Sequence, residues 1–584
     1  MTAWFEAFRP VRIGCALLAL ALAGAQPARG QSLMTDKIDP ALLELMQADP
    51  LALRPVIVEM RPPLPPFLGA ANVVRALEGL DILRLNGLPI SALPLINAAA
   101  GFADAAGIDA LSLDPEVAFI HYDRPVGLGQ STAATPPTHP EQASSVYPRV
   151  VKANRLWQEG VTGRGVAVAV LDSGVAADPD LGGSANRVLA SVNFADERLT
   201  PDPGGHGTHV AGIIAGNGSR SAGEFIGIAP QAGIVDVRVL GNSGGGRISS
   251  VVRGIEWVLE HRNAYNIRVI NLAFSARAPV SYRADPLSAA VEIAWRRGMV
   301  VVAAAGNGGP DRGSVRAPGT DPYVITVGAT DDRGTALRGD DVLAWFSAWG
   351  SVASSSKPDL VAPGRRLVSL RVPGSTLDRL FPERVVAAEN GATYFRLTGT
   401  SMATGVASGA AALLLQRRPG LTPDQVKALL LGTTQPYGQD SGQLLPDPSA
   451  DGKGLLDVYT ADATSPQSQS SGGLLSRLLQ PVLQLLSPNK GLRPSDAFAR
   501  AMYPVLYGTP LRWKDPTLGG ILWSLLTWET LDWDSVAWDN FDWDSVAWDS
   551  VAWDRVEWDS VAWDSVAWDS VAWDSVAWDT YTLD

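Results

Sequence analysis

The sequence predicts an α/β fold around a mostly parallel sheet, with a small α+β unit before it and a repetitive tail after it. From about Val146 to Ala461, short apolar runs alternate with longer helical patterns, which is typical of a parallel sheet covered on both faces. Residues 54–126 mix shorter strand and helix patterns, and Trp recurs twelve times, every five residues, from Trp523 to Trp578. The 584 residues are enough for two to four domains.

Residues 1–25 are interpreted as a secretory signal peptide. Arg9 and Arg12 are basic, and the apolar run over 13–24 is too short to span a bilayer. The single cysteine, Cys15, lies in this segment, so we expect the mature chain to have neither a disulfide framework nor a thiol nucleophile.

The negative charge is concentrated in the tail. Residues 523–584 hold 13 Asp, 2 Glu and 1 Arg, a net charge of −14, so the rest of a chain of net charge −13 carries +1. The sequence shows no basic stripe, and we therefore expect no nucleic-acid partner.

The first unit is expected to span residues 26–145, with a compact core over 54–126 and a Pro/Ser/Thr/Gln-rich linker over 127–145. Its pattern predicts a strand over 54–60, a helix over 70–80, two short strands within 81–93, a helix over 98–110 and a strand over 117–122.

The second unit is expected to span residues 146–461. Its apolar runs predict buried strands, and the segments between them predict helices. The strands are expected over 166–171, 234–240, 269–274 and 299–304, and the helices over 249–261 and 286–297.

Three motifs in this unit carry residue types suited to acyl transfer. A serine hydroxyl is a poor nucleophile without an adjacent base, and a carboxylate orients that base. Asp172 follows an apolar strand, His206 precedes a helical run, and Ser401 begins a small-residue helix whose positive end favours an oxyanion. The motifs are Val-Leu-Asp-Ser-Gly at 170–174, Gly-His-Gly-Thr-His at 205–209 and Gly-Thr-Ser-Met-Ala at 399–403.

Each residue has a plainer interpretation when it is taken alone. Asp172 is then a turn residue, Ser401 a helix cap, and Asn307 part of a Gly-Asn-Gly turn. His206 and His209 also suggest zinc, but no third ligand has suitable spacing, so we expect no metal site and a structural hydrogen bond for His209.

Together these motifs resemble the subtilases, the subtilisin-like serine peptidases, over residues 150–460. The resemblance implies a subtilisin-like three-layer fold, in which Asp172, His206 and Ser401 form a triad, and Asn307 with the Ser401 backbone N–H forms an oxyanion hole. Residues 54–126, most clearly 111–126, resemble the inhibitory propeptide of that family, which implies a small α+β ferredoxin-like domain.

By the same resemblance, two chain segments flank an extended peptide substrate. Main-chain pairing to such edges gives affinity, and side-chain pockets give specificity. The implied edge residues are Gly244, Gly245 and Gly246 on one side, and Ala273, Phe274 and Ser275 on the other.

Two positions depart from the family pattern. Gly405 stands where the family usually has proline four residues after the nucleophile, which loosens the start of the helix. Residues 273–276 read Ala-Phe-Ser-Ala where the family usually reads Ser-Leu-Gly-Gly. Because side chains replace glycine there, we expect a narrowed or reshaped S1 pocket and a preference other than large apolar residues.

Residues 462–522 are expected to be a linker with an amphipathic helix over 474–486, packed on the catalytic domain or, as the weaker alternative, lying on a membrane surface. The pentapeptide-repeat tail, 523–584, matches neither helix nor strand periodicity. A disordered acidic-aromatic segment is favoured over a solenoid with five residues per side. A cell surface, a glycan, another protein or cations all remain open as its partners.

The sequence therefore predicts a secreted or cell-surface serine endopeptidase, made as an autoprocessed zymogen and acting on proteins or peptides. No cofactor is expected to be required. Structural calcium is common in the resembling family, but no Asp-rich loop of the catalytic region identifies a site. The rival class is a surface-binding protein with an inactive protease domain, and the four intact catalytic positions argue against it.

Overall fold

The computed structural model describes two structured units and a few residues beyond them. These are residues 37–61, 71–128, 145–182, 186–195, 201–277, 281–352, 355–443, 445, 447–464, 489, 494–495 and 498. The predicted signal peptide, the leucine-rich helix over 474–486 and the repeat tail lie outside the described residues, as do residues 129–144 of the predicted linker.

The first unit is a four-stranded antiparallel sheet in the order β2-β3-β1-β4. Its core already includes Leu42 and Met46 of the first helix, so the unit begins before the predicted core at residue 54. In chain order its elements are α1 (Pro40–Ala48), β1 (Arg54–Met60), α2 (Ala71–Asn86), β2 (Leu88–Leu93), η2 (Pro94–Ile96), β3 (Ala98–Ala103), α3 (Ala105–Leu113) and β4 (Val117–Tyr122).

Two predictions within this unit are wrong. Residues 81–86 continue helix α2, where Leu83 is fully buried, instead of forming the first of two strands. Residues 98–103 form strand β3, although their alanines favour a helix. Pairing with β1 on one side and β2 on the other overrides that local preference, because a central buried strand accepts small side chains.

The second unit contains an eight-stranded sheet in the order β14-β13-β12-β10-β6-β8-β7, with β17 also paired to β13. All pairs are parallel except β13–β14. The four predicted strands are present as β6, β8, β10 and β12. The strands are β6 (Ala167–Asp172), β7 (Val188–Asn193), β8 (Gly233–Arg238), β10 (Ile267–Leu272), β12 (Val300–Ala304), β13 (Ile325–Asp331), β14 (Val342–Leu343) and β17 (Leu360–Pro363).

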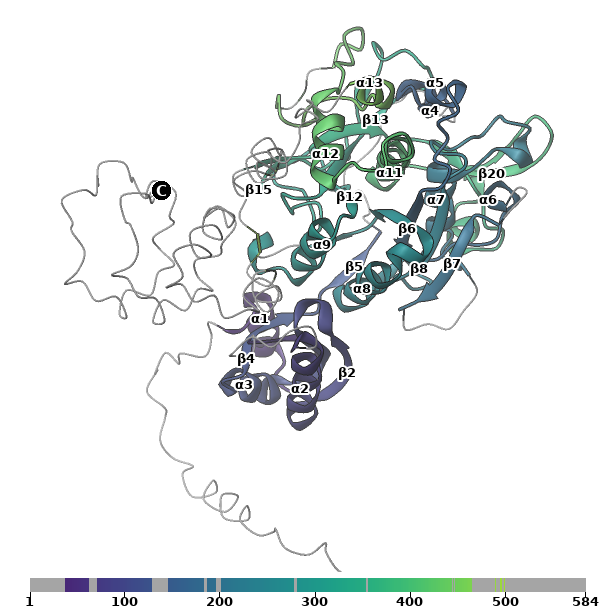
Figure 1. Ribbon diagram of the computed structural model, residues 1–584. Helices are drawn as coiled ribbons and strands as arrows, with labels where there is room; N and C mark the ends of the chain where they lie inside the picture. Colours follow the sequence, from purple (N-terminus) through teal and green to yellow (C-terminus); the bar gives the residue numbers. More distant parts are fainter. Residues whose placement is uncertain are drawn as a thin grey trace, which may run out of the picture.

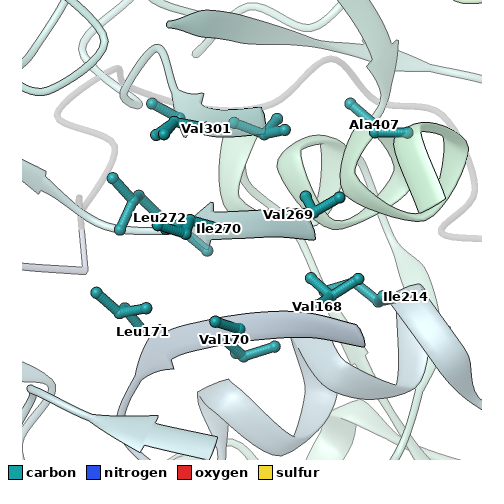
Figure 2. Close-up of a cluster of buried hydrophobic side chains, with 14 of the residues drawn as sticks. Val168, Val170, Leu171, Ile214, Val269, Ile270, Leu272, Val301 and Ala407 are labelled. Atoms are coloured by element: carbon teal, nitrogen blue, oxygen red, sulfur yellow. The ribbon is translucent and has the colours of Figure 1, made fainter. Parts of the chain in front are cut away.

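Helices cover both faces of this sheet. Helices α7 (His206–Ala215) and α11 (Thr400–Arg417) contact each other and the sheet, while α8 (Ile248–Tyr265) and α9 (Pro286–Arg296) form a second helical pair against it (Figure 1). Figure 2 shows Val168 of β6, Val269 of β10 and Val301 of β12 clustered with Ile214 of α7 and Ala407 of α11. The predicted helices over 249–261 and 286–297 are confirmed as α8 and α9.

Shorter elements complete the described chain. They are β5 (Pro125–Gly127), α4 (Tyr147–Val150), α5 (Ala153–Gln158), α6 (Pro179–Gly182), η3 (Ser219–Ser221), β9 (Gly245–Arg247), β11 (Ser275–Ala276), η4 (Tyr282–Ala284), β15 (Gly350–Val352), β16 (Ser355–Lys357), β18 (Leu367–Ser369), α10 (Thr376–Leu380), η5 (Pro382–Arg384), β19 (Val385–Ala387), β20 (Thr393–Leu397), α12 (Pro423–Gly432) and α13 (Val458–Ala463).

The two units share one hydrophobic core. Ile57, Leu93 and Ile96 of the first unit belong to the same buried cluster as the residues of the central sheet. Segments β2 and η2 contact α8, and η2 also contacts α9, so the first unit lies against this helical pair (Figure 1). After β4, the short strand β5 continues onto the second unit.

Part of the predicted linker over 462–522 returns to the second unit. The Ser495 backbone N–H donates to both carboxylate oxygens of buried Glu292, at 2.9 Å each. Lys427 Nζ donates to Asn489 Oδ1 at 3.0 Å, and the ring of Phe498 lies 5.9 Å from the Arg296 guanidinium carbon. These contacts anchor the chain on the surface formed by α9 and α12.

Candidate active site

Asp172 and His206 form a buried hydrogen-bonded pair at the carboxyl edge of the sheet. Asp172 is the last residue of β6 and is fully buried, while His206 is the first residue of α7. His206 Nδ1 lies 2.8 Å from Asp172 Oδ1 and 3.0 Å from Oδ2. This contact fixes the imidazole orientation and leaves Nε2 for chemistry.

The close approach of α7 to β6 depends on a missing side chain. A Cβ on Gly207 would lie 2.2 Å from the Gly174 carbonyl oxygen and 3.0 Å from the Asp172 Cβ. Any larger residue would therefore push the helix, and His206 with it, away from Asp172. This packing explains the second glycine of the Gly-His-Gly motif, Gly207.

The pKa of His206 is raised above its ordinary value. Burial alone lowers this pKa, but the charge and hydrogen bond of Asp172 outweigh the burial, and the charge of Asp202 adds to the rise. The interactions with Asp172 and Asp202 thus stabilise the imidazolium that forms when His206 removes a proton from a nucleophile.

Asp202 organises the loop that leads into His206, and sequence reasoning missed it. Its carboxylate is 2% exposed and accepts four hydrogen bonds. The donors are Ser173 Oγ at 2.8 Å, Gly205 N at 2.8 Å, Thr208 N at 2.9 Å and Thr208 Oγ1 at 2.6 Å. No local motif marks Asp202 in the sequence. The one feature that could have pointed to it is its position, an acidic residue four places before the candidate base.

Ser401 occupies the second position of helix α11 and is 6% exposed. Its hydroxyl donates to the Ala273 carbonyl oxygen at 2.7 Å, and within the described chain no hydrogen bond joins it to His206. Ala273 directly follows β10, whose Leu272 pairs with Leu171 of β6. Ser401 therefore lies at the same sheet edge as Asp172, and a rotation of its hydroxyl is needed to reach a base.

Asn307 follows β12 and is fixed by the residue before Ser401. Asn307 Oδ1 accepts hydrogen bonds from Thr400 N at 2.9 Å and Thr400 Oγ1 at 3.0 Å. The amide oxygen is thereby held on α11, and Nδ2 lies 3.3 Å from the position that a Cβ on Gly399 would take. This orientation presents an amide donor beside the positive end of the helix that carries Ser401.

His209 has the structural role predicted for it. Its Nε2 lies 3.0 Å from the Phe395 carbonyl oxygen, and the residue is fully buried. Burial first, and then the nearby His206, lower the pKa of His209 to about 3. In the described part of the chain, no group of three or more His, Cys, Asp or Glu is arranged to hold a metal ion.

The two predicted substrate edges are β-strands, and the chain's own β5 lies between them. Val126 pairs with Gly246 of β9 on one side and with Ala276 of β11 on the other, both antiparallel. The next residue beyond β5, Leu128, donates its N–H to the Gly244 carbonyl oxygen at 3.2 Å. A Cβ on Gly246 would lie 2.5 Å from the Val239 carbonyl oxygen, so this edge requires glycine.

A pocket of about 310 Å³ opens between β11 and Asn307. Of residues 273–276, Ser275 is the one that lines it, whereas the Phe274 side chain is 1% exposed and belongs to the central core. The side chain of Ser275, which stands where the family usually has glycine, therefore lines this pocket, whereas the Phe274 ring turns into the core. The expected narrowing or reshaping of the S1 pocket stays a prediction.

Comparisons with known proteins identify the family of the chain. The subtilase family model matches residues 163–459. The chain belongs to the subtilase family. Serine protease AprX of Bacillus subtilis is 40% identical over 305 residues, covering 51% of this chain and 66% of AprX. Subtilisin Savinase of Lederbergia lenta is 37% identical over 295 residues, covering 49% of this chain and 92% of that protein.

Among solved structures, Sphericase matches with a TM-score of 0.41 and 28% identity, covering 51% of this chain and 92% of that chain. Subtilases are serine endopeptidases, and membership places this chain in that class of enzyme. In the described residues of this subtilase, no helix is both long and apolar enough to cross a bilayer.

Proposed function

We propose that the chain is a secreted, autoprocessed zymogen whose first unit blocks its own peptidase site. The observation that carries this proposal is the position of β5. This strand pairs with both β9 and β11, as an extended peptide substrate would, and Leu128, the residue after it, lines the same pocket as Asn307. The β-α-β-β-α-β order of the first unit supports its assignment as a ferredoxin-like, inhibitory propeptide.

In the proposed reaction, Ser401 Oγ attacks the substrate carbonyl carbon while His206 Nε2 takes the hydroxyl proton. Asn307 Nδ2 and the Ser401 backbone N–H stabilise the negative charge on the carbonyl oxygen. The C–N bond then breaks, and His206 returns the proton to the leaving amine, which leaves an acyl-enzyme. Water hydrolyses this ester by the same two proton transfers, and no cofactor takes part.

Asp172 holds the imidazole in the tautomer whose Nε2 accepts a proton, and it stabilises the imidazolium by charge. Its double contact with Nδ1 and its complete burial support this role. We further propose that the −14 tail localises the enzyme by binding a surface, a glycan or another protein.

Ser401→Ala tests the proposal when it is expressed in a protease-free host. We expect the variant to lose peptide hydrolysis and fluorophosphonate labelling, and to keep its first unit attached in N-terminal sequencing. Ser441→Ala is a matched control, since Ser441 lies after α12 and its hydroxyl bonds only locally, donating to the Gly438 carbonyl oxygen at 2.7 Å and accepting from the Gln443 backbone N–H at 3.1 Å. Normal processing of Ser401→Ala would contradict autoprocessing, and an unlabelled wild-type chain would favour the inactive, surface-binding alternative.

A further inference from the structure

The pocket beside the oxyanion site is lined by two arginines that the proposed chemistry does not use. Arg316 and Arg277 line it together with Ser275, Asn307 and Gly308. Residues 125–128, the β5 strand and the residue after it, complete its lining. The pocket is therefore shared by the substrate track and by the group proposed to bind the carbonyl oxygen.

Position alone identifies which substrate residue enters this pocket. Strand β10 lies between β6, which ends at Asp172, and β12, which leads to Asn307. The pocket is on the Asn307 side, opposite the Asp172–His206 pair. The substrate residue whose carbonyl oxygen reaches Asn307 is the P1 residue, so its side chain is the one placed against Ser275 and Arg316.

The backbone holds Arg316 rigidly in this lining. Its N–H donates to the Ala305 carbonyl oxygen at 3.0 Å. The next residue, Ala317, exchanges two hydrogen bonds with Ala276 of β11, at 2.8 and 3.1 Å. Arg316 is thus tied both to the chain leading into Asn307 and to one substrate edge.

The Arg316 side chain runs along that same segment toward the pocket. Its Cγ lies 2.8 Å from the position of a Cβ on Gly306, so glycine there leaves room for the arginine stem. Nη2 lies 3.9 Å from the position of a Cβ on Gly308, next to Asn307. The guanidinium head is therefore at the wall of the pocket, close to the oxyanion site.

The charge of this wall is not neutralised within the described chain. Arg316 is half-buried and Arg277 is exposed at the mouth, and neither has an ion-pair partner among the described residues. A guanidinium that is partly removed from water favours a carboxylate, which it binds with two parallel hydrogen bonds. An apolar side chain in this position would desolvate the guanidinium without replacing its hydrogen bonds.

We propose that this pocket selects an acidic side chain, glutamate or aspartate, at P1. Arg316 is the specificity-determining residue, and Arg277 adds positive charge at the entrance. The inference rests on the proposed function, because it names the substrate class of that same site. It also gives a concrete form to the expectation that the pocket differs from one for large apolar residues.

The test uses the full chain after self-processing, with active sites counted by a fluorophosphonate probe. Internally quenched peptides that differ only at P1 (Glu, Asp, Gln, Leu, Phe or Lys) are compared by kcat/KM. We expect Glu to exceed Gln by roughly 10- to 100-fold. The Glu/Gln ratio should fall at high salt, because the pocket is open to solvent.

Three variants distinguish a loss of positive charge in the pocket from a general loss of folding or activity. Arg316→Met should bring the Glu/Gln ratio to about one while fluorophosphonate labelling persists, and Arg277→Met should lower the ratio by a smaller factor, about threefold. Arg297→Met removes an exposed arginine after α9 that is not part of the pocket, and it should leave the ratio unchanged.

The possible outcomes distinguish the two proposals. A labelled wild-type enzyme that cleaves after Leu or Phe at least as well as after Glu would overturn the acidic preference alone. A Glu/Gln ratio that survives in both Arg316→Met and Arg277→Met would do the same. If the chain neither reacts with the probe nor cleaves any peptide, the proposed function and this inference both fail.

Discussion

Asp202 offers the sharpest test of how the protein positions His206. Its buried carboxylate accepts hydrogen bonds from Ser173, Gly205 and Thr208 on both sides of the candidate base. Asp202→Ala removes all four bonds and leaves buried donors unsatisfied, at about 1–3 kcal/mol each and less than additively. We expect a total loss of roughly 3–5 kcal/mol of folding free energy, seen as a lower Tm in a Ser401→Ala background.

The same substitution should affect catalysis in two separable ways. A displacement of His206 by about 1 Å lowers kcat by roughly 10²-fold. The charge of Asp202 also contributes to the raised pKa of His206, so removing it should shift the midpoint of the pH profile of kcat/KM downward. Asp202→Asn keeps the shape and one acceptor oxygen, and it should show the same pH shift with a smaller loss of Tm.

The kcat and the pH profile are measured on processed enzyme whose active sites are counted with a fluorophosphonate probe. The Tm is measured by thermal unfolding of Ser401→Ala with and without the Asp202→Ala substitution. The combination is informative because a merely structural role would change the Tm alone. If Asp202→Ala unfolds at lower temperature but keeps the wild-type kcat and pH midpoint per labelled site, Asp202 does not position His206, and our reasoning is refuted.

Three further predictions concern the base, the substrate edge and the core. Because His206 accepts a proton only when it is neutral, and its pKa is raised, kcat/KM of the wild-type enzyme should rise with pH through a midpoint above about 6.5. Asp172→Asn should lower that midpoint and reduce kcat by roughly 10⁴-fold. A wild-type profile that is flat from pH 6 to 9 would contradict this prediction. Gly246→Ala should raise KM for long peptides more than for single-residue esters, since its Cβ would lie 2.5 Å from the Val239 carbonyl oxygen and disturb β9; equal effects on both substrates would count against the strand-pairing role. Phe274→Ala should cost about 3–5 kcal/mol, measured as Tm in the Ser401→Ala background, because its ring is 1% exposed in the core; an unchanged Tm with altered P1 preference would instead place the ring in the pocket.

Much of the central sheet could be predicted from local patterns. The strands β6, β8, β10 and β12 are buried apolar runs, and such runs are recognisable without knowledge of their neighbours. Strand β7 was missed because its exposed and half-buried residues alternate at the edge of the sheet. The alanines of β3 were misassigned because their helix propensity is local, whereas β1, which pairs with them on one side, is distant in sequence.

The sequence by itself determined the family, the parallel sheet and the identity of the candidate catalytic residues. Each of these is encoded within a few consecutive residues, because a nucleophile, a base and an amide donor each need a particular turn or helix start beside them. Only the tertiary structure decided that Asp202 supports His206, that Phe274 turns into the core and that β5 lies between the two edges. It also placed Arg316 beside Ser275, although 41 positions separate them, since a pocket collects residues by proximity in space and leaves no contiguous pattern in the chain.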